Sequence, residues 1–454
     1  MIHEARIRHF IAVPPADGRY VFYWMQQAQR TRFNHALSLA CEKANELKLP
    51  LVVGFVLTPD FPEAGFRHYK FMLEGIAELD EELSRLNIAF ILKTGDMVEG
   101  VIELAGRAAW VVADAGYLRI QRRWRKQVAD RLYCPFTVVE TDVVVPVTHA
   151  SDKEESAART LRPKLMKKLD SFLDPVEIRF YPERAIKQPA DFSRPIDPEM
   201  LACKIKPENQ HGEAKISHKG GQKAALRQLE DFINHRLADY SKLARDPAAD
   251  CRSGLSPYLH FGQISPVEII RRVRESNAPA EAKQAFIEQV LVRRELAVNF
   301  VYYNSQYDQY EGAVPAWARR SLSDHGNDRR PYVYTPGELE AGQTHDPYWN
   351  AAQAEMVNTG TMHNYMRMYW GKKIIEWSRS PAEAYSIMLD LNNRWQLDGR
   401  DSNGFAGVAW CFGRHDRPWK ERTVFGKIRY MNAAGLERKF RISEYVKRNM
   451  PQHY

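Results

Sequence analysis

The first 145 residues alternate between short apolar runs and stretches in which apolar residues recur at helical spacing. The apolar runs fall at 20–24, 51–57, 89–92, 110–113 and 137–139. Between them, the helical stretches cover 32–47, 69–86 and 121–132. Continuously apolar strands separated by amphipathic helices are typical of a parallel sheet covered by helices on both faces. The pattern predicts a doubly wound, Rossmann-like α/β domain over residues 1–145, although neither a G-x-G-x-x-G fingerprint nor a P-loop occurs in it.

The alternation stops after residue 145. Residues 146–220 carry charge clusters and many prolines, which predicts a long interdomain connector over the surface with one helix around 163–172. From residue 221 to 454 helical periodicity dominates, and we expect a second, all-helical domain there. Its candidate helices are 223–239, 266–275, 279–303, 347–377, 381–391 and 442–447.

Composition narrows the function without defining it. No run of 18 apolar residues and no apolar leader occurs, and the five cysteines are scattered, so we expect a cytoplasmic protein without a membrane span, disulfide framework or structural zinc. The net charge of +8 indicates an anionic partner. The tryptophans are more informative, because seven of the ten fall from Trp317 onward.

One helical stretch, residues 362–377, combines charge with aromatic residues. Arg367, Trp370, Ile374 and Trp377 share one stripe of a helix, with the two indoles about 10 Å apart along its axis. The simpler interpretation is a core stripe with one solvated arginine. The alternative is that Arg367 has a buried partner, since an unpaired buried charge is costly, and that the indoles relay an electron.

Two further segments offer ligand-binding chemistry. Residues 397–419 combine four glycines with Asp398, Arg400 and Asp401, and with two tryptophans, Trp410 and Trp419, whose flat faces suit stacking. Residues 253–262 place glycine and hydroxyl groups ahead of a helix, as in a phosphate-binding turn. The alternatives are a turn-rich loop with salt bridges for the first segment and a simple helix cap for the second.

Taken together and in this order, several motifs resemble the photolyase/cryptochrome superfamily, most closely the class II cyclobutane pyrimidine dimer photolyases. The motifs are SGLSPYLHFG at 253–262, THDPYWNAAQ at 344–353, MHNYMRMYWGKKIIEW at 362–377 and LDGRDSNGFAGVAW at 397–410. YVFYWMQQAQR at 20–30 and SDKEESAARTLRPK at 151–164 are also similar to that class. The likeness extends over nearly the whole chain.

The resemblance implies that the helical domain binds FAD in a bent conformation. The residues that would hold the FAD phosphates are Tyr240, Arg252, Ser253, Gly254, Leu255 and Ser256. Asn364 and Arg367 would lie along the flavin, with Arg367 paired to Asp398, while Arg400 and Asp401 would flank the ring or the adenine. Asn392 would face the reactive flavin nitrogen, with Asn403 as the alternative.

The resemblance also assigns the electron path and the lesion contacts. Trp370, Trp349 and Trp377 would photoreduce the flavin, with Trp370 nearest and a crossing between segments at Trp349. Trp410 would pack on the flipped dimer, and the loop of His415, Asp416, Arg417 and Trp419 would fill the hole left in the duplex. The acid against the dimer is predicted as Glu288, with Glu295 as the alternative, and Gln289 stands where a second acid is expected. The candidate phosphate contacts are Arg245, Lys420, Arg422, Lys427 and Arg429.

The sequence therefore predicts light-driven repair of cyclobutane pyrimidine dimers in UV-damaged DNA by electron transfer from excited, reduced FAD. We expect a monomer without an obligate protein partner or a metal, and an antenna chromophore that is a deazaflavin or, as second choice, a folate. A cryptochrome-like photoreceptor is the main alternative, opposed by Trp410, the 415–419 loop and the lack of a long C-terminal extension. A flavin-dependent oxidoreductase would need a nicotinamide site, and (6-4) photoproduct repair is associated with paired histidines.

Overall fold

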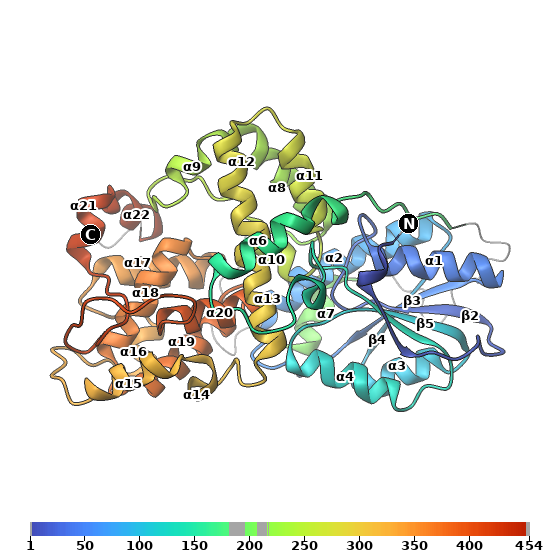
Figure 1. Cartoon of the computed structure of the whole chain (residues 1–454), viewed down its shortest axis with the longest axis horizontal. Coiled ribbons are helices and arrows are strands. Elements are labelled where there is room, and N and C mark those ends of the chain that lie inside the picture. Colours follow the sequence, from blue (N-terminus) through green and yellow to red (C-terminus); the bar gives the residue numbers. More distant parts are fainter. Residues whose placement is uncertain (1, 181–195, 207–215, 217, 451–454) are drawn as a thin grey trace.

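The computed structural model describes residues 2–180, 196–206, 216 and 218–450. Figure 1 shows an α/β domain on the right and a domain of packed helices on the left. Both predicted fold classes are confirmed. No helix in the described ranges is long and apolar enough to cross a membrane.

The sheet has six strands in the order β1-β6-β5-β2-β3-β4. Their bounds are β1 Ile7–Ile11, β2 Tyr20–Trp24, β3 Leu51–Leu57, β4 Ala89–Thr94, β5 Ala108–Asp114 and β6 Phe136–Val139. All neighbouring pairs are parallel except β1 with β6. The sequence pattern did not predict β1, because this antiparallel edge strand is only half-buried and therefore lacks a continuous apolar run.

Helices cover both faces of the sheet. They are α1 His35–Leu47, α2 Phe66–Arg85, α3 Met97–Ala105 and α4 Arg119–Ala129. Successive side chains of a strand point to opposite faces. In β2, Val21 and Tyr23 accordingly share a core with α1 and α2, whereas Phe22 and Trp24 share one with α3 and α4.

The connector contributes to the core instead of lying over the surface as we expected. It contains α5 Val147–Ala150, α6 Ala158–Lys168, a 3-10 turn at Leu169–Phe172 and α7 Pro198–Ile205. Leu161 and Leu165 of α6 are buried in the same cluster as Leu229 and Phe232 of the helical domain, and Ala202 of α7 is buried in the α2 side of the α/β domain. Residues 181–195 and 207–215 of the predicted connector lie outside the described residues.

The helical domain is built from short and medium helices. Their bounds are α8 Gln222–His235, α9 Tyr240–Leu243, α10 Ser256–His260, α11 Pro266–Glu275, α12 Ala280–Ile287, α13 Arg294–Tyr303, α14 Tyr310–Ala313, α15 Ala316–Asp324, α16 Pro336–Glu340, α17 Pro347–Thr359, α18 Asn364–Trp377, α19 Pro381–Trp395, α20 Ser402–Cys411, α21 Ala433–Lys439 and α22 Ile442–Asn449. A 3-10 turn, Leu237–Asp239, precedes α9, and a π-helical segment, Glu288–Arg293, joins α12 to α13.

The single helix predicted over 347–377 is wrong, because the chain turns at Gly360. Gly360 has a φ of 72°, and a Cβ atom there would lie 2.7 Å from Cγ of Leu397. The Leu397 amide donates to the Gly360 carbonyl at 2.7 Å. The turn separates α17 from α18, so Trp349 lies on a different helix from Trp370 and Trp377.

Candidate active site

Three tryptophans form a continuous chain of buried rings, which we call the tryptophan path. Trp349 on α17 and Trp370 and Trp377 on α18 are at most 2% exposed. The Trp349 ring lies 6.2 Å from that of Trp370 with an interplanar angle of 8°, and 5.7 Å from that of Trp377 at 66°. The rings therefore follow the order Trp370, Trp349, Trp377, and Trp349 bridges two residues of one helix.

Hydrogen bonds fix the rings of this path. The Trp349 indole nitrogen donates to the Trp370 carbonyl at 3.0 Å, and that of Trp370 donates to Oε1 of Gln353 at 2.9 Å. At the outer end, Trp377 contacts the rings of Tyr334 at 5.4 Å and His345 at 5.3 Å. Sequence reasoning missed these two residues, because they stand 43 and 32 residues before Trp377 and meet it only in the folded chain.

Arg367 lies one helical turn before Trp370 and has the partner that the helix pattern demanded. Its Nη2 atom is 3.1 Å from Oδ1 of Asp398 and donates to Oε1 of Gln396 at 2.7 Å. Nε of Arg367 and Nε2 of Gln396 are buried and donate to no protein acceptor among the described residues. Two orphaned donors at one place indicate a bound group that offers acceptor atoms there.

The predicted amides lie near the end of α19 and at the start of α20. Nδ2 of Asn392 donates to Oδ1 of Asn393 at 3.1 Å, and a Cβ atom on Gly404 would lie 3.0 Å from the same Nδ2. Oδ1 of Asn393 also accepts the backbone N–H of Arg400 at 2.9 Å. The buried Arg400 side chain bonds the Asn393 carbonyl and lies 3.0 Å from Nε2 of His68 on α2. Arg400 therefore joins the two domains, and burial lowers its pKa to about 10.

Asp401 caps the amino-terminal end of α20. Its carboxylate accepts the Asn403 amide at 2.8 Å and the Asn403 side-chain amide at 2.9 Å, and it lies 3.3 Å from Nδ1 of His260. Burial opposes ionisation of this carboxyl group, but the hydrogen bond and charge of His260 outweigh it and hold the pKa of Asp401 below its usual range. Asn403 is thereby committed to the cap, whereas Asn392 keeps its place at the close approach of Gly404.

The predicted phosphate turn is present between α9 and α10. Gly254 has a φ of 69°, and Nε2 of Gln228 donates to the Ser253 carbonyl at 2.8 Å. Nη1 of Arg252 lies 2.7 Å from Oε1 of the buried Glu355 on α17. The same Glu355 accepts the His363 amide at 3.0 Å, which ties the turn to the start of α18.

The remaining predicted phosphate-side residues surround this turn. The Tyr240 ring packs edge-on against Phe286 at 5.2 Å, and burial raises its pKa to about 12. Leu255 is buried, whereas Ser256 and Asn364, which begin α10 and α18, are exposed. The predicted flavin-side and phosphate-side residues thus occupy neighbouring, linked parts of the helical domain.

A second group of aromatic residues, the outer tryptophan cluster, lies near the end of α20. It consists of Trp410, Asp416, Arg417, Trp419 and Arg429. The Arg429 guanidinium lies 5.3 Å from the Trp410 ring and 4.1 Å from the Trp419 ring, and it forms an ion pair with Asp416 at 2.9 Å. The Trp419 indole nitrogen donates to Asp416 at 3.2 Å, and Arg417 lies over the Trp419 ring at 5.3 Å.

Comparisons with known proteins identify the family. A family model described as DNA photolyase matches residues 21–182. The chain is 46% identical to a deoxyribodipyrimidine photo-lyase of Methanothermobacter thermautotrophicus, over 99% of this chain and 98% of that protein. The chain belongs to the DNA photolyase family. A second relative of the same name, from Potorous tridactylus, is 40% identical over 94% of this chain and 81% of its own length.

Solved structures of the same fold include both a photolyase and a cryptochrome. A class III photolyase from Agrobacterium tumefaciens has a TM-score of 0.76 at 18% identity, covering 96% of this chain and 87% of that protein. A cryptochrome from Synechocystis has a TM-score of 0.74 at 16% identity, covering 97% and 90%. The fold alone therefore does not separate repair from signalling. The relatives named photo-lyase make that distinction. They confirm, at the level of the family, the prediction that this protein is an enzyme of the FAD-dependent photolyase class.

The acids predicted to face the lesion have protein partners in this photolyase. Glu288 forms ion pairs with Arg162 at 2.8 Å and Arg293 at 3.2 Å. The alternative, Glu295, is buried and accepts the Val144 amide at 2.5 Å. Burial raises the pKa of Glu295 to about 8. This residue ties α13 to the segment after β6 and is only 4% exposed, so it is not available to DNA. Gln289 is exposed.

Apart from the candidate flavin site in the helical domain, the photolyase has a second pocket, which lies at the carboxyl edge of its sheet, beyond β3. Side chains of the 26–29 loop, of β3 and the residues after it, and of α2, α4 and the 260–261 segment line it. Its buried polar atoms Oε1 of Gln26, Oε1 of Gln29 and Oγ1 of Thr58 have no partner among the residues described. Ligands in doubly wound folds bind at this edge.

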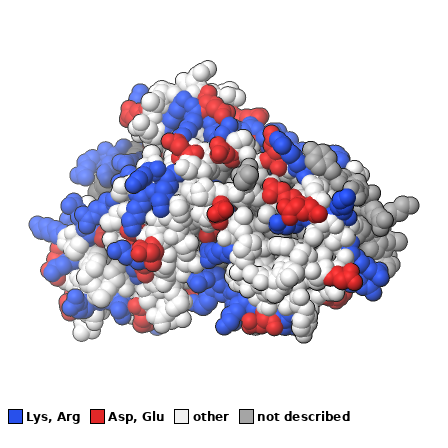
Figure 2. Space-filling view, turned by 45° about the vertical axis from the view of Figure 1, so that its right-hand side comes forward, with Lys and Arg blue, Asp and Glu red and all other residues white. Residues whose placement is uncertain are grey.

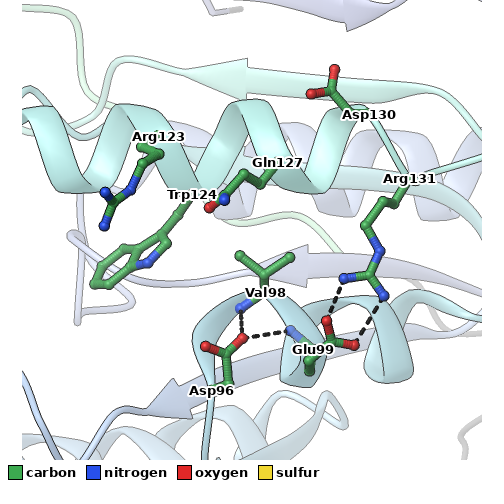
Figure 3. Close-up of a pocket in the computed structure, with 8 residues that line it drawn as sticks. All are labelled: Asp96, Val98, Glu99, Arg123, Trp124, Gln127, Asp130 and Arg131. Carbon is green, nitrogen blue, oxygen red and sulfur yellow. Dashed lines mark hydrogen bonds and ion pairs between the residues drawn. The ribbon is translucent and has the colours of Figure 1, made fainter.

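A separate groove of about 670 Å³ runs between α3 and α4 on the outside of the α/β domain (Figure 3). Trp124 lines both this groove and the second pocket. Figure 3 shows Arg131 reaching across to Glu99, at 2.5 and 2.9 Å, while Asp130 points away. Of the charged side chains that line the groove, Glu99 and Arg131 are paired with each other, and Asp96 caps α3.

Basic side chains are unevenly spread over the surface. On the face shown in Figure 2, Lys and Arg gather on the left, over the helical domain, with Asp and Glu scattered among them. Of the candidate phosphate contacts, Arg245, Lys420, Arg422 and Lys427 are exposed and Arg429 is partly buried. Exposed cations of this kind can neutralise DNA phosphates.

Proposed function

We propose that this photolyase repairs cyclobutane pyrimidine dimers in UV-damaged DNA. The observation that carries the proposal is the order of the tryptophan path, Trp370, Trp349, Trp377, which ends one helical turn from the Arg367–Asp398 pair. On the other side of α18 lies the outer tryptophan cluster with its partly exposed Trp410. Relatives named for splitting deoxyribodipyrimidines, at 40–46% identity, support the same lesion.

The residues present fit FAD. The orphaned donors of Arg367 and Gln396 match a group with carbonyl and ring-nitrogen acceptors, and the Gly254 turn offers backbone amides for phosphate. Bound there, reduced FAD would supply a light-excited one-electron donor for opening the dimer, with the electron returned at the end and no net oxidation. Arg367, Asp398 and Asn392 would hold the flavin, and Arg252 to Ser256 the phosphates.

The protein itself must keep the dimer out of the stack. Trp410 offers a flat face for it, and Trp419 and Arg417, on an exposed loop, are placed to occupy the space that it leaves. Glu288 or Gln289 would contact the dimer from the π-helical segment, with Glu288 first released from Arg162 or Arg293. Arg245, Lys427 and Arg429 would contact phosphates, and a monomer supplies all these residues from one chain.

We infer that the second pocket holds an antenna chromophore, with a deazaflavin favoured over a folate. Its unsatisfied amide and hydroxyl oxygens suit the edge of a flat heterocycle. The open volume of about 110 Å³ is below the roughly 300–1,000 Å³ of most ligand sites, so binding requires lining side chains to move. Mass spectrometry of the chromophore released from purified protein distinguishes the two, and a protein that releases only FAD contradicts the inference.

The test of repair is illumination of the purified, reduced holoenzyme with DNA that carries a single cyclobutane dimer. Loss of the dimer, measured by chromatography of the digested DNA, is expected under blue light and not in the dark. A matched substrate with a (6-4) photoproduct serves as the control for lesion specificity. Flavin absorbance without dimer loss would contradict repair and favour the cryptochrome-like alternative.

A further inference from the structure

One charged side chain lies between the two tryptophan groups and belongs to neither. Lys372 on α18 is 0% exposed, its Nζ atom donates to the Cys411 carbonyl, and the same atom lies 5.7 Å from the centroid of the Trp410 ring. No carboxylate of the described residues forms an ion pair with it. A buried ammonium without a counter-ion is costly, so its place in the core needs a functional reason.

The backbone around Lys372 is arranged to let it reach the end of α20. A Cβ atom on Gly371 would lie 2.7 Å from Sγ of Cys411 and 3.0 Å from Sδ of Met388, so a glycine is needed for the approach of α18 to α20 and α19. Cys411 is the last residue of α20. The carbonyls at this end of a helix attract cations, and the Lys372 ammonium occupies that position.

We propose that Lys372 is a positioning residue for lesion binding: its ammonium fixes the end of α20 and thereby holds the Trp410 ring where the dimer packs. The proposal rests on the proposed repair function and deepens it. Arg429 also lies near this ring, at 5.3 Å from its centroid. Trp410 is thus close to one buried cation and to one partly exposed cation, and the buried one has no mobile solvent shell.

The groups that face Lys372 allow it to change charge near neutral pH. They are the Cys411 thiol on α20, and Asp416 and Arg429 on the segment after α20. Burial lowers the pKa of Lys372 to about 8 and raises that of Cys411 to about 11, so the lysine loses its proton first. As the pH rises through 8, the cation beneath Trp410 is lost, and lesion binding should weaken with it.

The experiment compares Lys372→Met and Lys372→Arg with Lys283→Met. Lys283 on α12 is the control, since it also donates to carbonyls at a helix end, those of Arg274 and Ser276, and these partners belong to neither tryptophan group. The readout is the dark dissociation constant for dimer-containing duplex between roughly pH 6.5 and 9.5. Undamaged duplex gives the nonspecific background.

We expect Lys372→Met to weaken dimer binding on the order of tenfold at pH 7 and to remove the weakening above pH 8. Lys372→Arg should restore affinity and keep it across the range, because its guanidinium stays charged. Lys283→Met should behave as the wild type, and blue-light photoreduction should be unchanged in all three.

Wild-type affinity and an unaltered pH profile in Lys372→Met would overturn the proposal. If Lys372→Met loses flavin or fails to fold, the test rests on the wild type and Lys372→Arg. The same pH dependence of dimer binding in these two proteins between pH 7 and 9.5 would also overturn the proposal. Failure of the repair function is a separate outcome, since it would show as wild-type protein that removes no dimers in light.

Discussion

The tryptophan path and the outer tryptophan cluster use the same residue type in opposite surroundings. Trp370, Trp349 and Trp377 are at most 2% exposed and are held by rings, a carbonyl and an amide, whereas Trp419 is 37% exposed and lies against guanidinium groups. Buried neighbouring groups fix the rings of the tryptophan path, whereas an exposed loop and the contacts with guanidinium groups hold the outer tryptophan cluster.

The difference follows from what each set has to do. A path for electrons needs rings at constant separation, which a close-packed interior provides. A surface that receives DNA has to accept a base and a phosphate backbone, which exposed aromatic faces and cations provide. If this division is correct, substitutions in one set leave the measurement that reports on the other unchanged.

The largest effect is expected for Trp370→Phe. This variant removes the inner ring of the path, so photoreduction of oxidised flavin should slow by about 100-fold or more, equivalent to about 2.7 kcal/mol in barrier. Dimer repair by chemically reduced enzyme should remain near the wild-type rate. Absorbance under blue light with an external reductant measures the first and dimer loss the second. Trp395→Phe, a buried tryptophan outside the path, is the control, and unchanged photoreduction in Trp370→Phe would refute the path.

Asp398→Asn tests the region between the two sets. Loss of one partner from a largely buried ion pair costs about 2–5 kcal/mol, so we expect FAD affinity to fall about 30-fold or more. The flavin-to-protein ratio after dialysis reports this loss. Asp390→Asn, which breaks the more exposed pair with Arg394, should retain FAD. Equal flavin retention in both variants would show that the Arg367–Asp398 pair does not serve the flavin.

Trp419→Ala should act only on DNA. Removal of one stacking aromatic costs about 1–3 kcal/mol, and we expect about tenfold weaker binding of dimer-containing duplex with unchanged photoreduction. Fluorescence anisotropy with labelled duplex measures the affinity. Tyr133→Ala, at 96% exposure on the α/β domain, is the matched control. Slower photoreduction in Trp419→Ala would break the separation between the two sets.

The smallest effect is expected for Lys427→Ala. If Lys427 neutralises one phosphate, its loss should weaken binding about two- to threefold for damaged and undamaged DNA alike, and reduce the salt slope of the affinity by about 1. A titration over several salt concentrations gives both values. The control Lys93→Ala, on the α/β domain, should leave the salt slope at its wild-type value. A wild-type salt slope in Lys427→Ala as well would show that Lys427 does not contact a DNA phosphate.

Local sequence pattern predicted the parts of this fold that are locally determined. The five parallel strands were recognised because buried strands read as unbroken apolar runs, as in β3, where all seven residues are buried. Helix α3 was not recognised, since MVEGVIELA is short and contains Gly100, whose Cβ would lie 2.9 Å from Cγ1 of Val56. Helix α20 was not recognised either, because glycines at 404 and 407 suggested a loop.

The sequence predicted which residues belong to the site better than it predicted how they are arranged. The order of the motifs led to Arg367 and Asp398. In the structure Nη2 of Arg367 lies 3.1 Å from Oδ1 of Asp398, although the two residues are 31 positions apart along the chain. Nothing local indicated that Gln396 would share Arg367, that Asn403 would be taken up by the cap of α20, or that Glu295 would bind the segment after β6. These contacts depend on helices that meet only after folding.

The sequence by itself determined the βαβ alternation, the helical second half, the family and the residues available for electron transfer and DNA contact. Those properties depend on the periodicity and order of residues along the chain. Tertiary structure alone decided that Trp349 bridges Trp370 and Trp377, that the connector joins the core, and that Lys372 ends beneath Trp410. Helical periodicity defines which residues share a face, but non-local packing chooses the element that covers that face.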